Sequence, residues 1–135
     1  MNKSGLIHPE LLRELALCGH GDKILLADGN YPLERQTGDA VKIHLGLQAG
    51  IPTVSQVLQA VLETVKAEKA EVMLPEDGSV PSVYGEFTQL MEGIKPEGLA
   101  RADFYAACAD PRVRVAVSTG EQRPFANILL TVGVA

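Results

Sequence analysis

Residues 23–27, Lys-Ile-Leu-Leu-Ala, place four apolar side chains in unbroken succession directly after a glycine-rich turn. A strand with one side in solvent alternates apolar and polar residues, whereas a strand covered on both faces is apolar throughout. The run therefore predicts a strand buried between two layers of other elements. Gly19 and Gly21 precede the run and Gly29 follows it, so that turn residues bound the strand at both ends.

Segments with helical periodicity alternate with further short apolar runs. The clearest helix follows Thr53, a good N-cap residue, and repeats valine and leucine every three or four residues as far as Val65. We expect other helices at 9–18, 82–91 and 101–109, other strands at 41–45, 71–74, 113–117 and 128–132, an exposed stretch at 33–40 and a connector at 94–100. This alternation predicts an α/β fold, a three-layer α/β/α sandwich around a mostly parallel sheet that is mixed if the closing strand is reversed.

Composition excludes several classes of protein. The 135 residues, 1–135, are expected to form one domain. A net charge of −5 argues against nucleic-acid binding, and no run of like charges suggests a membrane surface. No apolar run approaches the ~20 residues of a membrane-spanning helix, and no signal-peptide pattern follows Met1, so a cytoplasmic location is expected. Cys18 and Cys108 are expected to be reduced, buried thiols. No glycine-rich nucleotide loop follows the first strand, so no nucleotide cofactor is indicated.

His20 is the first candidate for chemistry, because it lies between two glycines and no large neighbouring side chain crowds its imidazole. Histidine gives and takes protons near neutral pH, since its unperturbed pKa is about 6.5. Asp28 follows the predicted strand, at the end where open α/β sheets usually bind ligands. The pair suggests acid–base chemistry on a small polar molecule. Two other interpretations stay open: His20 is structural or merely exposed, and Asp28 initiates a turn.

A second cluster of candidate residues, Thr119–Asn127, carries Glu, Arg and Asn side chains in a predicted turn. These groups can exchange hydrogen bonds with sugar hydroxyls, but a solvated turn in which Asn127 bonds its own backbone has the same pattern. His8 is interpreted as a helix cap or surface residue, and His44 as a core or edge histidine. Three scattered histidines without an i, i+4 pair are a poor zinc signature, so no metal is expected.

The two end motifs together resemble those of a known family. Gly-His-Gly-Asp-Lys at 19–23, three aliphatic residues and then Asp28 resemble the first signature of the ribose pyranase/L-fucose mutarotase (RbsD/FucU) family. Gly120-Glu121, the segment 125–130 and Gly133-Val134 resemble its second signature. The resemblance covers nearly the whole chain and is weakest from about 68 to 100.

Other positions refine the resemblance. The helix start at 50–53, Gly-Ile-Pro-Thr, also matches the family. Arg101 and the opening His-Pro-Glu-Leu-Leu at 8–12 are closer to the fucose mutarotase branch. Two positions depart from the family pattern, which usually has tyrosine in place of Phe125 and an acidic residue in place of His44.

The resemblance implies an isomerase without a cofactor that interconverts cyclic anomers or ring forms of a monosaccharide, L-fucose-like or D-ribose, by general acid–base ring opening. It implies His20 as the catalytic acid–base residue, and a substrate-binding set made of Asp28, Arg101, Phe125, Ala126 and Asn127. It also implies a homo-oligomer, a decamer of two pentameric rings with sites at subunit contacts. The first alternative is a non-catalytic sugar-binding or regulatory oligomer that retains the pocket, and the second is an oligomeric scaffold with no sugar site.

Overall fold

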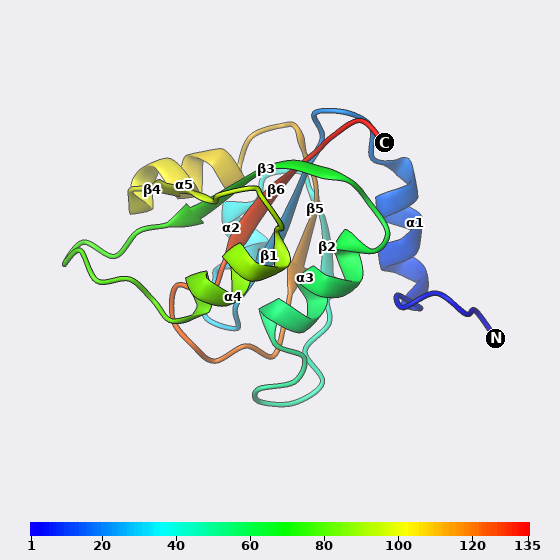
Figure 1. The fold of residues 1–135 in the computed structure, drawn as a ribbon, viewed down its shortest axis with the longest axis horizontal. Helices are drawn as coiled ribbons and strands as arrows, with labels where there is room; N and C mark the ends of the chain where they lie inside the picture. The colour runs from blue at the N-terminus through cyan, green and yellow to red at the C-terminus, as the bar shows by residue number, and fades with distance from the viewer.

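A six-stranded sheet forms the centre of the computed structural model, which describes residues 1–135 (Figure 1). In chain order the elements are α1 (Pro9–Leu17), β1 (Lys23–Ala27), α2 (Leu33–Gln36), β2 (Val41–His44), α3 (Val54–Leu62), β3 (Ala67–Met73), α4 (Val83–Leu90), β4 (Glu97–Leu99), α5 (Arg101–Cys108), β5 (Val113–Ser118) and β6 (Ile128–Val132). The strand order is β2-β5-β1-β6-β3-β4. Only β6 runs against its neighbours, β1 and β3. The predicted mostly parallel, mixed sheet is therefore confirmed.

Helices cover both faces of the sheet, as the apolar run at 23–27 predicted. All five residues of β1 are buried. Ile24 and Leu26 belong to a cluster of 22 buried residues that includes side chains of α1, α3 and α4. Leu25 and Ala27 belong to a cluster of 11 that includes side chains of α2 and α5. Figure 1 shows α3 and α4 in front of the sheet and α2 behind it, so the three-layer sandwich is present.

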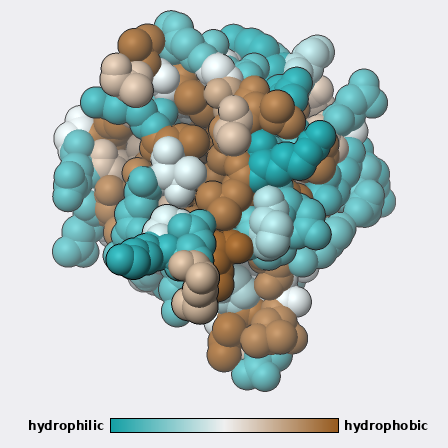
Figure 2. All heavy atoms as spheres, turned by 90° about the vertical axis from the view of Figure 1, so that its right-hand side faces the viewer, coloured by the Kyte–Doolittle hydropathy of each residue, from teal (hydrophilic) through white to brown (hydrophobic).

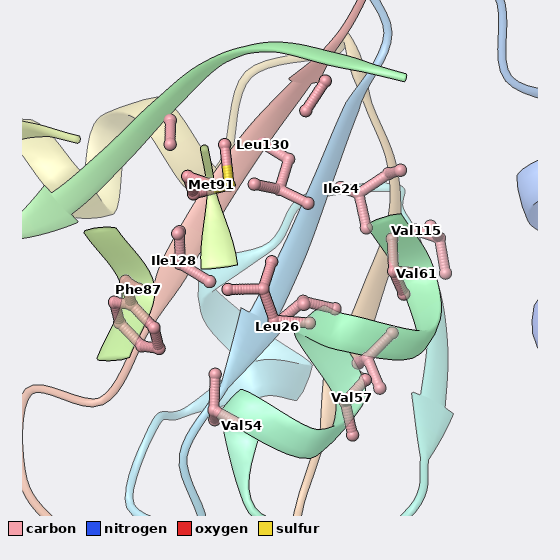
Figure 3. Close-up of a cluster of buried hydrophobic side chains, with 14 of the residues drawn as sticks. Ile24, Leu26, Val54, Val57, Val61, Phe87, Met91, Val115, Ile128 and Leu130 are labelled. Carbon is pink, nitrogen blue, oxygen red and sulfur yellow. The ribbon is translucent and has the colours of Figure 1, made fainter. Parts of the chain in front are cut away.

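The larger cluster lies between the sheet and α3 and α4 (Figure 3). Val54, Val57 and Val61 repeat with the helical period, and in the figure they point from α3 towards the strands. The side chains of Leu26 and Ile128 approach them from β1 and β6. Because such a core is close-packed, replacing a buried leucine by alanine costs about 2–5 kcal/mol of the free energy of unfolding.

Two segments differ from the sequence-based expectation. The stretch 33–40, expected to be exposed, contains the single turn α2, and its Leu33, Thr37 and Ala40 are buried. The polar composition of this stretch suggested exposure. Thr37 can nevertheless be buried, because its hydroxyl donates a hydrogen bond to the Leu33 carbonyl at 2.7 Å. The connector at 94–100 contains β4, a three-residue edge strand whose Glu-Gly-Leu sequence has too little β pattern to predict.

Several element ends also differ from the expected positions. The helix α3 ends at Leu62 rather than Val65, and β3 begins at Ala67 rather than Glu71. Thr53 caps α3 as predicted, in a capping box with Gln56. Ser82 precedes α4 but makes no capping hydrogen bond, because its backbone is already helical.

The two edges of the sheet at which its strands begin and end carry different candidate residues. The carboxyl ends of the parallel strands lie at one edge, and the reversed strand β6 begins there. The loop before β6 therefore meets the residues that follow β1. The turn before β1, which carries His20, lies at the opposite edge, beside the end of β6. No helix is both long enough and apolar enough to cross a lipid bilayer.

Candidate functional site

Asp28 is the residue that directly follows β1, and it is almost fully buried, with 2% of its surface exposed. Its Oδ1 accepts a hydrogen bond from the Asn30 backbone N–H at 2.9 Å. Its Oδ2 accepts from the Ala126 backbone N–H and from Asn127 Nδ2, both at 3.2 Å. Burial raises the pKa of Asp28 above its usual range, and these hydrogen bonds to the carboxylate oppose that effect.

The loop 119–127 connects β5 to β6 and supplies the other half of the site. Its first residue is anchored to the end of β1, since the Thr119 hydroxyl donates to the Ala27 carbonyl at 2.9 Å. The Gly29 backbone N–H donates to the Glu121 carbonyl at 2.7 Å. At Phe125 the backbone is left-handed, with φ of 60°, an uncommon conformation for a residue other than glycine. A residue in this conformation persists only where the surrounding structure holds it.

An ion-pair network holds this loop against the helices α3 and α4. The Arg123 guanidinium donates through Nε to Oε1 and through Nη2 to Oε2 of Glu121, both at 3.0 Å. It also donates to both carboxylate oxygens of Glu86 on α4. These bonds to Arg123 lower the pKa of both carboxyl groups. Glu121 Oε2 in addition accepts from the Val54 backbone N–H at the start of α3, at 3.3 Å. Neither Glu86, Glu121 nor Arg123 lines the pocket described next.

A pocket of about 220 Å³ opens where Asp28 and this loop meet the start of α5. It is lined by Asp28, Asn30, Tyr31, Met73, Arg101, Tyr105, Pro124, Phe125 and Asn127. Four of the residues predicted from the sequence thus lie together: Asp28, Arg101, Phe125 and Asn127. A fifth, Ala126, is completely buried and does not line the pocket, but its backbone N–H donates a hydrogen bond to Asp28 Oδ2. A carboxylate, an amide and a guanidinium beside aromatic rings form a surface suited to a small polyhydroxylated molecule.

His20 is the predicted site residue that the structure does not bring into this pocket. The five residue-to-residue steps from Lys23 to Asp28 span about 16 Å at ~3.3 Å per step of strand, and His20 lies beyond the other end. Its side chain is 59% exposed, and Nε2 lies 3.0 Å from Oε1 and 3.1 Å from Oε2 of Glu68. Within one chain, the imidazole and the pocket are at opposite edges of the sheet.

Sequence reasoning missed five lining residues. Tyr105 could have been found, because it follows Arg101 by four positions on a predicted helix and so shares its face. Tyr31 lies at an angle of 56° to Tyr105, with ring centroids 5.5 Å apart. Asn30, Met73 and Pro124 come from three separate segments, and only the tertiary fold brings them together.

The remaining candidate residues have structural partners. His8 caps α1, since its Nδ1 accepts from the Leu11 backbone N–H at 3.2 Å. His44 lies exposed on the edge strand β2, with Nε2 2.8 Å from Oε1 of Glu34.

Cys108 is buried and Cys18 half-buried, and burial raises the pKa of these free thiols to about 12 and about 11, respectively. No three His, Cys, Asp or Glu side chains lie close enough together to hold a metal ion.

Comparison with known proteins identifies the family of this chain. The model of the RbsD / FucU transport protein family matches residues 1–135. The chain belongs to this family. A D-ribose pyranase of Paracidovorax citrulli is 32% identical, and the match covers 99% of this chain and 98% of that protein.

Solved structures extend the RbsD / FucU comparison to the fold. Bacillus subtilis RbsD complexed with D-ribose is 28% identical, with a TM-score of 0.88 over 100% of this chain and 99% of that chain. The fucose mutarotase from Streptococcus pneumoniae in complex with L-fucose is 27% identical, with a TM-score of 0.86 over the same shares. The family inferred from the sequence motifs and the α/β sandwich inferred from the alternation of helices and strands are both confirmed.

Proposed function

We propose that this protein is a monosaccharide mutarotase or pyranase, an isomerase that interconverts cyclic anomers or ring forms of a sugar without a cofactor. The observation that carries the proposal is the pocket at the end of β1. There the buried carboxylate of Asp28 and the amide of Asn127 lie beside Phe125 and Arg101, in a chain of the RbsD / FucU family. We assign sugar binding to Asp28, Arg101 and the segment 125–127.

The chemistry requires only proton transfers. The anomeric hydroxyl loses its proton as the bond between the anomeric carbon and the ring oxygen breaks, and the electron pair stays on the ring oxygen, which takes up a proton. Reclosure on the other face returns both protons and inverts the anomeric centre. A positioned imidazole contributes ~10²–10⁴-fold to such a step. We assign this acid–base role to His20.

Because His20 and Asp28 lie at opposite edges of the sheet, we propose that the His20 imidazole acts in the pocket of a neighbouring subunit. The assembly is the homo-oligomer that the sequence resemblance implies, a decamer of two pentameric rings. Exposed apolar surface supports an assembly. Leu47 is 79% and Ile51 45% exposed in the loop 45–53, which Figure 1 draws at the lower edge of the molecule. A hydrophobic group projects from that edge in Figure 2, and such patches mark contact sites.

The sugar is proposed to be L-fucose-like, with D-ribose as the second candidate. Arg101 supports the fucose type, because it lines the pocket at a position that resembles the fucose branch. Residues 1–135 are proposed to act as one domain, in the cytoplasm, on a free monosaccharide.

Two-dimensional NMR exchange spectroscopy of anomers tests the function directly. L-fucose, D-ribose and other monosaccharides are each measured with and without protein. Faster exchange between the anomer signals of at least one sugar is expected. Saturable sugar binding without faster exchange would instead support the non-catalytic sugar-binding alternative. The absence of both binding and exchange for every sugar would contradict the proposal.

Subunit mixing tests the shared site. His20→Gln and Asp28→Asn each remove one half of the site and are expected to be inactive. Mixed subunits of the two variants, dissociated and reassembled together, are expected to regain part of the activity, because some sites then combine an intact His20 with an intact Asp28. A mixture that stays inactive while wild-type protein survives the same treatment would contradict a site shared between subunits.

A further inference from the structure

The imidazole of His20 is held by a carboxylate that no sequence motif singled out. Glu68 presents both of its oxygens to His20 Nε2, at 3.0 and 3.1 Å. The other ring nitrogen, Nδ1, makes no hydrogen bond within the chain. An acceptor-only carboxylate takes a hydrogen bond only from a nitrogen that carries a proton. In the neutral ring the proton therefore lies on Nε2, and Nδ1 is the basic nitrogen.

The position of Glu68 in its strand explains how its side chain reaches His20. In the antiparallel pairing of β3 with β6, Ala67 pairs with Val132 and Lys69 pairs with Thr131. Two steps along β3 therefore correspond to one step along β6, and Glu68 is the extra residue of a β-bulge. Bulges re-aim a side chain and are over-represented next to active sites. Because of the bulge, the Glu68 side chain departs from the regular alternation of the strand and points towards the turn that carries His20.

The last residue of β6, Val132, and the next residue, Gly133, lie against the histidine turn and against Glu68, respectively. The Gly21 backbone N–H donates to the Val132 carbonyl at 2.9 Å, and the Val132 N–H donates to the Asp22 carbonyl at 2.8 Å. The next residue, Gly133, makes room for Glu68, since a Cβ atom at Gly133 would lie 3.0 Å from Glu68 Cβ. The end of β6 thus fixes the histidine turn and admits the bulge beside it.

The histidine turn itself is also restrained. Gly21 has φ of +88°, a left-handed conformation that glycine adopts without strain. The Gly19 backbone N–H donates to Asp22 Oδ2 at 2.8 Å and closes the turn from the other side. With the backbone fixed, the remaining freedom of His20 is rotation about its two side-chain bonds, and the two-oxygen contact with Glu68 restricts that rotation.

We propose that Glu68 is a positioning residue for His20: it accepts the Nε2 proton in a hydrogen bond, orients the ring, and leaves Nδ1 as the nitrogen that exchanges a proton with the sugar. This inference rests on the proposed function. In the step, Nδ1 takes the proton of the anomeric hydroxyl, the electron pair of the breaking ring bond goes to the ring oxygen, and solvent water protonates that oxygen. Reclosure returns both protons, so that His20 and Glu68 end as they began.

The test compares Glu68→Ala and Glu68→Gln with a matched control, Glu34→Ala. Glu34 forms the other exposed histidine–carboxylate pair, with His44 at 2.8 Å, and lies outside the proposed machinery. Because Glu68 is 46% exposed, its variants are expected to fold. The first readout is the ¹⁵N spectrum of the His20 ring in sugar-free protein, recorded with the imidazole neutral. Wild type is expected to show the Nε2–H tautomer alone, and Glu68→Ala a mixture that includes Nδ1–H.

The second readout is sugar exchange. In Glu68→Ala, kcat is expected to fall about tenfold at unchanged KM, a partial loss of the ~10²–10⁴ that a positioned acid–base group contributes. Glu68→Gln is expected to retain most of kcat, because its amide oxygen accepts the same hydrogen bond, and Glu34→Ala to retain all of it.

Three results would overturn the proposal: an Nδ1–H tautomer in wild type, identical His20 spectra in wild type and Glu68→Ala, or an unchanged kcat in Glu68→Ala. Wild-type protein that exchanges no sugar would refute the proposed function and, with it, a role of Glu68 in this reaction. The tautomer spectra, recorded without sugar, would still show whether Glu68 holds the ring.

Discussion

Asp28 and Asn127 exchange two hydrogen bonds across 99 positions of sequence. The Asp28 backbone N–H donates to Asn127 Oδ1 at 2.8 Å, and Asn127 Nδ2 donates to Asp28 Oδ2 at 3.2 Å. The side-chain amide of asparagine suits this reciprocal contact, because it offers a donor and an acceptor side by side. The pair joins the end of β1 to the start of β6 and sets the floor of the proposed sugar pocket.

The first prediction concerns this pair. Asn127→Ala removes both hydrogen bonds and leaves the buried Asp28 N–H without a partner, so the free energy of unfolding should fall by about 1–3 kcal/mol. Urea denaturation followed by circular dichroism measures the change. Asn30→Ala is the control, since the Asn30 amide makes only a long 3.5 Å contact with the Gln122 carbonyl and should cost much less. Equal losses in the two variants would contradict the importance of the pair.

The second prediction concerns the pH dependence of stability at Asp28. Burial raises the pKa of Asp28 in the folded protein above its ordinary value of 3.8. Between those two pKa values the folded state holds more protons than the unfolded state, so the contribution of Asp28 to stability falls as the pH rises through that window. The unfolding free energies of wild type and Asp28→Asn, compared from about pH 3 to pH 7, should therefore shift in favour of the variant as the pH rises. A shift of the opposite sign would show that the hydrogen bonds outweigh the burial.

The third prediction concerns a buried ion pair beneath α5. Lys23 Nζ lies 3.1 Å from Glu71 Oε1, and the two residues are only 6% and 5% exposed. Lys23→Met leaves a buried carboxylate whose nearest remaining cation is Lys69, at 3.8 Å, so a loss of about 3 kcal/mol in unfolding free energy is expected. Adding Glu71→Leu should recover much of that loss. Chemical denaturation of the single and double variants checks both values, and a double variant less stable than the single one would be inconsistent with this account.

The fourth prediction separates His20 from the other exposed histidine. His20→Gln keeps a polar side chain but removes the titratable group, so anomer exchange should fall at least tenfold, given the ~10²–10⁴-fold that such a group supplies. His44→Gln is matched in exposure and also removes a contact with a glutamate, and it should leave the rate unchanged. Circular dichroism establishes that both variants are folded. Equal rates in the two variants would remove His20 from the mechanism.

The fifth prediction concerns Phe125, which lines the pocket where the family usually has tyrosine. For an L-fucose-like sugar, Phe125→Tyr should improve kcat/KM several-fold, because one additional hydrogen bond is worth about 0.5–1.5 kcal/mol. Exchange rates of both forms on L-fucose, D-ribose and the best other sugar measure the effect. A lower rate on the best sugar would mean that the pocket is shaped for a sugar without a partner for that hydroxyl. No change on any sugar would mean that Phe125 serves packing alone.

Much of the fold could be predicted because its signals are local. The strand at 23–27 was recognisable from consecutive apolar residues, and the helix after Thr53 from its cap and its period. Both signals come from the geometric repeat of a strand or a helix, so residues that are close together in the sequence are enough to show them. The buried turn at 33–36 and the short strand at 97–99 escaped prediction, because their stability comes from what packs or pairs with them.

The candidate site divides in the same way. Sequence patterns were enough to identify the candidate residues, His20, Asp28 and the segment 125–127, and the buried strand that ends just before Asp28. Only the tertiary structure inserted β6 between β1 and β3, which brought Asn127 to Asp28 and Glu68 to His20. It also placed His20 and Asp28 at opposite edges of the sheet. These relationships depend on strand order and on one bulge, which long-range hydrogen bonding and packing of the whole chain select together, so no local pattern encodes them.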